Sequence, residues 1–243
     1  MAILIEKTSE KPCALCFGFR ELQRSHAIPN SFFKKVINGR QATVVTKNGK
    51  CKPSNSSWAS YQLCYDCENH LNKSYEQYSV SFLKGKRGIV NKNQNSIEFY
   101  NLEIEIIYLF FLSVFWRAAN SEIIEYSKVV IPDIWSDRIR KSIANKDIGS
   151  SELVKVRLSR LIYKDETEKT KQLIAIPFCR QISEQNFCFC FVFGGFFIEF
   201  FLPSIDLCGN GVVTLETREL KIPFIDLYNI PELFDIVEKG CRA

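Results

Sequence analysis

The sequence predicts an α+β protein with a small N-terminal module followed by a C-terminal domain of helices and an antiparallel sheet. Three observations predict this organisation. Residues 1–80 hold five of the ten cysteines and both histidines, residues from about 97 onward are more apolar, and two aromatic-rich runs flank a Gly-Gly pair near position 194. With 243 residues and 46% apolar side chains, the chain is long enough to bury a substantial core.

Two Cys-x-x-C pairs mark the N-terminal module, which we assign to residues 1–83. Cys13 and Cys16 form the first pair, Cys64 and Cys67 form the second, and 47 residues separate the pairs. Paired knuckles of this kind supply four thiolates in the tetrahedral arrangement that structural Zn²⁺ prefers. Four unrelated thiols or a thioredoxin-like dithiol are the alternatives, and neither explains two pairs. We therefore expect structural zinc on these four cysteines, which would supply folding energy to a small module.

Residues 84–96 are expected to form a linker, because their Gly, Asn and Lys content favours a solvated connection. The C-terminal domain then spans residues 97–243. It begins with a mostly buried helix, for which Asn101 is the expected N-cap. Pro132 and Asp133 open a second helix, whose apolar residues recur at helical spacing on one face.

From Glu152 the pattern changes to that of strands. Apolar and basic residues alternate at 153–163, and the runs on either side of Gly194 and Gly195 predict a β-hairpin with a two-glycine turn. The hairpin carries more Phe than one sheet face can bury, so we expect a helix or a partner protein to cover part of it. The tail from Ile230 predicts a short closing helix.

Composition sets limits on partners and location. The net charge of +5 is a mild excess that supports a nucleic-acid partner without establishing one. The first residues do not form a secretory signal, and ten cysteines in such a chain are interpreted as reduced thiols, so we expect a cytoplasmic protein. The most apolar stretches, residues 104–116 and 187–202, are shorter than the roughly 20 residues that a bilayer requires. No membrane association is expected.

A further motif, Ser-His-Ala-Ile-Pro at residues 25–29, lies between the two cysteine pairs. Together with the pairs, it resembles the HNH endonuclease family, the zinc-knuckle branch of the ββα-metal (treble-clef) nucleases. The resemblance covers residues 10–80. The pattern is also similar to an uncharacterised bacterial HNH-like group, some of whose relatives belong to mobile-element or phage-defence loci. The resemblance to the HNH family implies a treble-clef module that cleaves DNA with Mg²⁺ or Mn²⁺ as the catalytic ion.

The resemblance also implies roles for individual residues. His26 has the position of the general base, which takes a proton from the attacking water. The residue before the base usually binds the catalytic metal, and here it is Ser25, a weak ligand. Glu68 follows the last zinc cysteine, and Asn72 lies one helical turn later on the same face, so both would hold the metal through oxygen. Asn55 is the candidate for the family's middle asparagine.

Structural alternatives stay open for these residues. His26 could pack beneath the knuckle or bind zinc, and Glu68 could be an acid favoured by the dipole at a helix N-terminus. Basic side chains crowd the segment between the knuckles, where they would either neutralise phosphates or solvate a hairpin. The candidate nucleic-acid contacts are Lys34, Lys35, Arg40, Lys47, Lys50, Lys52 and, on the following helix, His70.

These observations lead to three hypotheses. The first is a metal-dependent HNH-type DNA endonuclease whose C-terminal domain recognises a target or a partner. The second is a catalytically inactive zinc module that binds nucleic acid or a protein, having lost the metal ligand at Ser25. The third is an adaptor that docks a protein partner through its Phe-rich sheet. DNA is the expected partner, with RNA as an open alternative.

Overall fold

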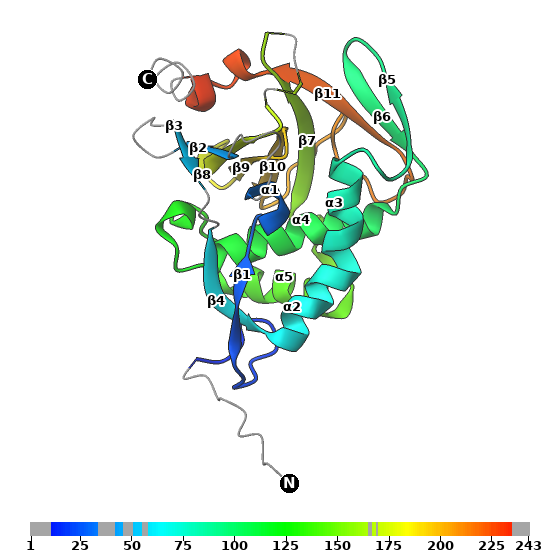
Figure 1. The fold of residues 1–243 in the computed structure, drawn as a ribbon. Coiled ribbons are helices and arrows are strands. Elements are labelled where there is room, and N and C mark those ends of the chain that lie inside the picture. Colours follow the sequence, from blue (N-terminus) through cyan, green and yellow to red (C-terminus); the bar gives the residue numbers. More distant parts are fainter. Residues whose placement is uncertain are drawn as a thin grey trace.

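The computed structural model describes residues 11–33, 42–45, 51–54, 58–164, 167–168 and 170–234. The fold is α+β: a large sheet lies at the top in Figure 1, helix α4 runs beneath it, and β1, β4 and α2 form the lower end. The strands are β1 (Leu22–His26), β2 (Ala42–Val45), β3 (Cys51–Ser54), β4 (Ala59–Cys64), β5 (Ile89–Lys92), β6 (Ser96–Tyr100), β7 (Lys155–Ile162), β8 (Leu173–Gln181), β9 (Phe187–Phe193), β10 (Phe196–Leu202) and β11 (Leu220–Asp226). The helices are α1 (Asn30–Phe33), α2 (Tyr65–Leu71), the π-helix η1 (Asn72–Glu76), α3 (Gln77–Leu83), α4 (Ile104–Ala119), α5 (Asp133–Asn145) and the 3-10 turns η2 (Ile124–Tyr126), η3 (Gly149–Glu152) and η4 (Leu227–Asn229).

The large sheet has nine strands in the order β3-β2-β8-β9-β10-β7-β11-β6-β5. Most neighbours are antiparallel, as the sequence predicts, but β2 pairs with β8 and β11 pairs with β7 in parallel. The sheet is therefore mixed. Both parallel pairs join strands that are far apart in the chain, as parallel pairing requires, because a tight turn can join only antiparallel neighbours.

The β9–β10 hairpin has the predicted two-glycine turn. Gly194 and Gly195 have φ values of 63° and 82°, the left-handed region that a tight hairpin turn of this kind requires at both positions. A Cβ atom at Gly195 would lie 2.1 Å from Nη1 of Arg160, so the turn also needs the space that glycine leaves.

Elements of the same chain cover both faces of this Phe-rich hairpin. On one face, the ring of Phe115 from α4 stacks on Phe200 with centroids 4.8 Å apart. On the other face, Phe197 is in a cluster with Leu227 and Ile230 from the C-terminal part. The helix that the sequence led us to expect over the hairpin is therefore α4.

The two predicted helices before the strands form, with one difference at a boundary. Of the predicted closing helix, only residues 231–234 lie within the described part, where they are helical. α5 begins at Asp133, directly after Pro132, as expected. α4 begins at Ile104 with Glu103 as its N-cap, rather than at Asn101. Asn101 has a φ of 57°, which is left-handed, and an N-cap residue normally has extended backbone. Among the described residues, no helix combines the length and the apolar character needed to cross a membrane.

The N-terminal and C-terminal parts are more closely joined than the sequence suggests. Strand β2, from the expected N-terminal module, lies inside the large sheet. The expected linker, residues 84–96, is exposed up to Asn95 but contains strand β5, which pairs with β6 at the sheet edge. One hydrophobic cluster runs from Cys13 to Ile222. The core is thus continuous across the expected boundary.

Candidate functional site

The four cysteines of the two knuckles come together at the lower end of the molecule. Cys13 and Cys16 lie before β1, Cys64 ends β4, and Cys67 lies in the first turn of α2. All four sulfur atoms lie within 4.8 Å of one another, and the sulfurs of Cys16 and Cys64 are 3.9 Å apart. Tetrahedral zinc with bonds of about 2.3 Å places its sulfur ligands about 3.8 Å apart. The cluster therefore has the composition and spacing to hold a metal ion such as zinc.

Local hydrogen bonds hold the cluster in this form. The backbone N–H of Cys64 donates to Sγ of Cys13 at 3.3 Å, and the N–H of Cys13 donates to the carbonyl of Gly18 at 2.9 Å. Hydrogen bonding from Cys67 lowers the pKa of the Cys13 thiol to about 4, while the same contact raises the pKa of Cys67. Hydrogen bonds from neighbouring thiols thus stabilise one thiolate, that of Cys13. A bound cation would stabilise the thiolate form of all four cysteines.

A ββα arrangement follows directly from these cysteines. β1 and β4 pair antiparallel, with His26 opposite Ala59 and Leu22 opposite Cys64. α2 begins at the next residue after β4. In Figure 1, α2 and the helical turns that follow it run alongside β1. His26, the last residue of β1, lines the same pocket as Glu68 and Asn72 of this helical segment.

A pocket of about 450 Å³ opens between β1 and this helix. It contains three of the predicted site residues, His26, Glu68 and Asn72. Ser25 is buried and does not line the pocket, but its hydroxyl donates to Oε2 of Glu68 at 2.7 Å. The lining residues are Gln23, Arg24, His26, Asn30, Tyr65, Glu68, Asn69, Asn72 and Glu76.

Three charged residues of this site were not predicted: Arg24 and Glu76, which line the pocket, and Arg117 behind it. Arg117 lies in α4 and is 1% exposed. Its Nη1 is 3.8 Å from Oε1 of Glu68 and its Nη2 is 3.5 Å from Oε2 of Glu76. Its Nε donates to the carbonyl of Ser113 at 3.3 Å. The buried guanidinium therefore lies between two pocket carboxylates, and burial raises the pKa of Glu76 while Arg117 partly lowers it.

The π-helix η1 explains how both carboxylates reach one cation. In an α-helix, four residues exceed a full turn by about 40°, so a residue eight positions away has rotated well off the first face. A π-helical turn holds more residues, so four of them fall short of a turn. The π segment at 72–76 thus rotates Glu76 back toward the face of Glu68. The available sequence signal was Arg117, the lone basic residue of a mostly apolar helix.

Other predicted site residues lie elsewhere or outside the described residues. His70 faces α5, where its Nε2 is 3.4 Å from the carbonyl of Ile143 and its ring meets Tyr75 edge-on. It does not line the pocket. Lys52 lies in β3, but its side chain is not described. The remaining candidates outside the described residues are Lys34, Lys35, Arg40, Lys47, Lys50 and Asn55.

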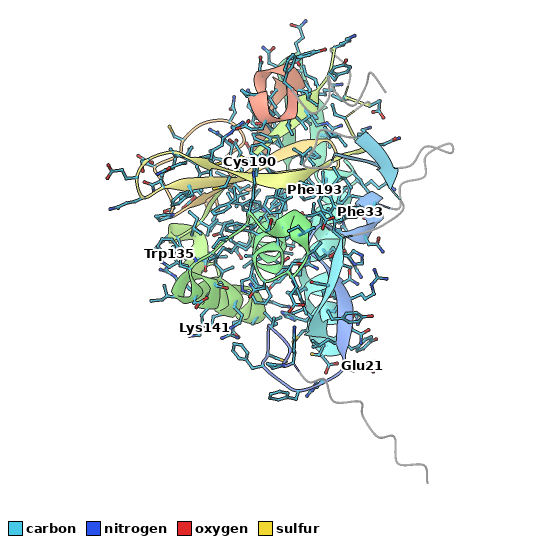
Figure 2. The ribbon with its side chains drawn as sticks, turned by 90° about the vertical axis from the view of Figure 1, so that its left-hand side faces the viewer. Glu21, Phe33, Trp135, Lys141, Cys190 and Phe193 are labelled. Carbon is cyan, nitrogen blue, oxygen red and sulfur yellow. The ribbon has the colours of Figure 1, made fainter. Side chains whose placement is uncertain are left out.

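A second group of potential metal ligands lies in the large sheet. Sγ of Cys188 is 3.7 Å from Sγ of Cys190 and 3.9 Å from Oε1 of Glu199. Both oxygens of Glu199 already accept hydrogen bonds from Arg157, at 2.7 and 2.9 Å. Figure 2 shows Cys190 in the sheet layer, away from the end that holds Glu21. The carboxylate is neutralised by arginine, so this group is better explained as a buried ion pair beside two thiols.

The whole chain was compared with known proteins. None of the family models, curated proteins or solved structures matches it. Function is therefore inferred from the residues of this site: a four-cysteine cluster, the antiparallel β1–β4 pair followed by α2, and a pocket lined by a histidine, two carboxylates and three asparagines.

Proposed function

We propose that this chain is a metal-dependent endonuclease of the HNH type that hydrolyses phosphodiester bonds in DNA. The observation that carries the proposal is the pocket shared by His26, Glu68 and Asn72 beside the four-cysteine cluster. Zinc on the four cysteines would fix the end of β4 to the start of α2 and to the segment before β1. A zinc ion bound in this way would give the treble-clef arrangement that the motifs resemble.

His26 is assigned as the general base. It ends β1 and lines the pocket, where a neutral imidazole would take the proton of the attacking water. Glu68 and Asn72 supply oxygen atoms of the kind that hold Mg²⁺ or Mn²⁺. When bound there, such an ion stabilises the charge that develops on the phosphate.

Ser25 and Arg117 would act on Glu68 rather than on the substrate. The Ser25 hydroxyl fixes one carboxylate oxygen, and Arg117 lies behind the other. Ser25 would therefore not bind the metal itself but would hold the metal ligand Glu68 in position.

Plasmid nicking in Mg²⁺ or Mn²⁺ tests this proposal. Full-length zinc-loaded protein should nick supercoiled DNA, and His26→Ala and Glu68→Gln should abolish nicking while the zinc content is retained. His70→Gln is the matched control, because it alters the only other histidine, which lies outside the pocket. Nicking by His26→Ala at the wild-type rate would exclude His26 as the base.

The second candidate is a catalytically inactive zinc module that binds nucleic acid. Two contacts favour it: Ser25 is buried against Glu68, and Arg117 already supplies a positive charge to that carboxylate. Salt-sensitive DNA binding that is unchanged in His26→Ala, with no cleavage in either metal, would select this candidate.

A further inference from the structure

The segment from Lys84 to Asn95, here named the basic hairpin segment, concentrates positive charge. Between Glu76 and Glu98 the chain has no acidic residue, and the segment contains four cations. All twelve of its residues are exposed. Among the described residues, none of the four cations forms an ion pair with a carboxylate. These cations are Lys84, Lys86, Arg87 and Lys92.

The backbone of the basic hairpin segment is held in a defined conformation. The N–H of Lys86 donates to the carbonyl of Ser81 at 2.9 Å, and β5 pairs with β6. Gly88 has a φ of 75°, and a Cβ atom there would lie 2.7 Å from the carbonyl oxygen of Tyr100. The close approach requires glycine at this position. The positive charges are therefore presented by an ordered turn and strand.

The segment also lies next to the pocket. It follows directly on the helix that carries Glu68, Asn72 and Glu76, and the rise of an α-helix places Lys84 about 12 Å beyond Glu76 along the axis. Helix α1 makes a second connection, because Asn30 lines the pocket and the ring of Phe32 lies 5.7 Å from Nζ of Lys84. In Figure 1 the helix leads from the β1–β4 end to the β5–β6 hairpin.

We propose that the basic hairpin segment binds the phosphate backbone of the nucleic acid on one side of the scissile bond. This inference rests on the proposed function. Phosphates on one strand of a duplex are spaced by about 3.4 Å along the axis, so for a duplex that runs along this helix, the backbone of Lys84, about 12 Å beyond that of Glu76, lies level with a phosphate about four base pairs away. The segment carries four cations and no carboxylate of its own, and the nearby Glu98 is already paired with Lys221, so its net charge of +4 is complementary to a polyanion. Arginine and lysine that contact phosphates contribute affinity without reading sequence.

The test compares two triple variants with the same loss of charge. Lys84→Gln/Lys86→Gln/Arg87→Gln alters the segment, and Lys128→Gln/Lys141→Gln/Lys146→Gln is the control. Figure 2 shows Lys141 on the opposite side of the molecule from Glu21, which precedes β1. Both are made in full-length His26→Ala protein, and duplex affinity is measured across a range of KCl concentrations.

The segment variant should reduce the slope of log K against log salt by about 2 to 3, because about 0.9 counterion is released per phosphate contact. The control should keep the wild-type slope. Lys86→Gln alone should reduce the slope by about 1, which provides a milder variant if the triple one folds poorly. A duplex ending fewer than about four base pairs from the cleaved bond on that side should abolish the difference between the two triple variants.

Equal slopes for the two triple variants would overturn the inference, as would competition by polyglutamate as strong as that by DNA of equal charge. The outcome is separable from that of the proposed function. Cleavage by the wild type with no slope difference rejects the hairpin contact alone, whereas a slope difference without cleavage in Mg²⁺ or Mn²⁺ supports the contact and rejects the nuclease. Absence of all nucleic-acid binding rejects both.

Discussion

Replacing Arg117 with methionine should destabilise the protein by about 3 to 5 kcal/mol at neutral pH, the cost of removing one partner from a buried ion pair. The Arg117 side chain is 1% exposed, while those of Glu68 and Glu76 are 28% and 24% exposed. At contact distances of 3.8 and 3.5 Å and an effective dielectric constant of about 20, each contact supplies about 4 to 5 kcal/mol of attraction before desolvation is subtracted. Methionine replaces the apolar part of the Arg117 side chain but removes the cation, so the carboxylates of Glu68 and Glu76 lose their positive partner.

The destabilisation should shrink at acid pH. Burial raises the pKa of Glu76 above its ordinary value, and Arg117 lowers it in part, so the variant should raise that pKa further. A carboxyl whose pKa is higher in the folded state stabilises the fold below its unfolded pKa, and this contribution disappears as pH rises through the folded pKa. The difference between variant and wild type should therefore be largest near about pH 7.5 and smaller near about pH 5.

Urea unfolding of zinc-loaded protein at both pH values measures this effect. The matched control is Glu76→Gln, which removes one carboxylate and keeps the cation. Arg117→Met combined with Glu76→Gln should lose less stability than the sum of the single variants, since the pair is in contact. A loss below about 1 kcal/mol, or the same loss at both pH values, would refute the proposed role of the buried cation.

Two further predictions concern the metal cluster and the core. Cys64→Ser should reduce bound zinc from one ion per chain to a small fraction, as measured by mass spectrometry of the purified protein. Cys208→Ser, which alters an exposed thiol outside the cluster, should leave one ion bound. Equal zinc in both variants would contradict the four-cysteine site. Phe115→Ala should reduce the free energy of unfolding by about 3 to 5 kcal/mol, because it empties the stack on the sheet. Phe187→Ala, at a side chain that is 37% exposed, should lose much less, and equal losses in chemical denaturation would show that the stack contributes little.

Features set by a few neighbouring residues could be predicted from the sequence. The two Cys-x-x-C pairs, the turn at Gly194 and Gly195 and the start of α5 after Pro132 each depend on local backbone requirements. The pocket could be anticipated as far as His26, Glu68 and Asn72, because a motif and a helical spacing placed them.

Features that depend on distant partners could not be predicted. The pairing of β2 with β8 has no local signature, because the two strands are separated by more than half the chain. The role of Arg117 depends on α4 packing against the α2–α3 helix, and the alignment of Glu76 with Glu68 depends on a π segment that helical periodicity does not reveal. A single basic residue in a mostly apolar helix was the available hint of this arrangement.

The insertion of β2 into the large sheet has a consequence for biosynthesis. β2 ends at Val45 and its neighbour β8 begins at Leu173. At ribosomal speeds of about 5 to 20 residues per second, β2 waits about 6 to 26 seconds for that neighbour to be made. The amino-terminal knuckle residues can gather around an ion much sooner, once α2 has emerged. With an ion bound to the four cysteines, a nascent chain would carry an ordered amino-terminal end and an incomplete sheet at the same time. A message truncated before Leu173 yields a product that lacks β8 and cannot complete the sheet.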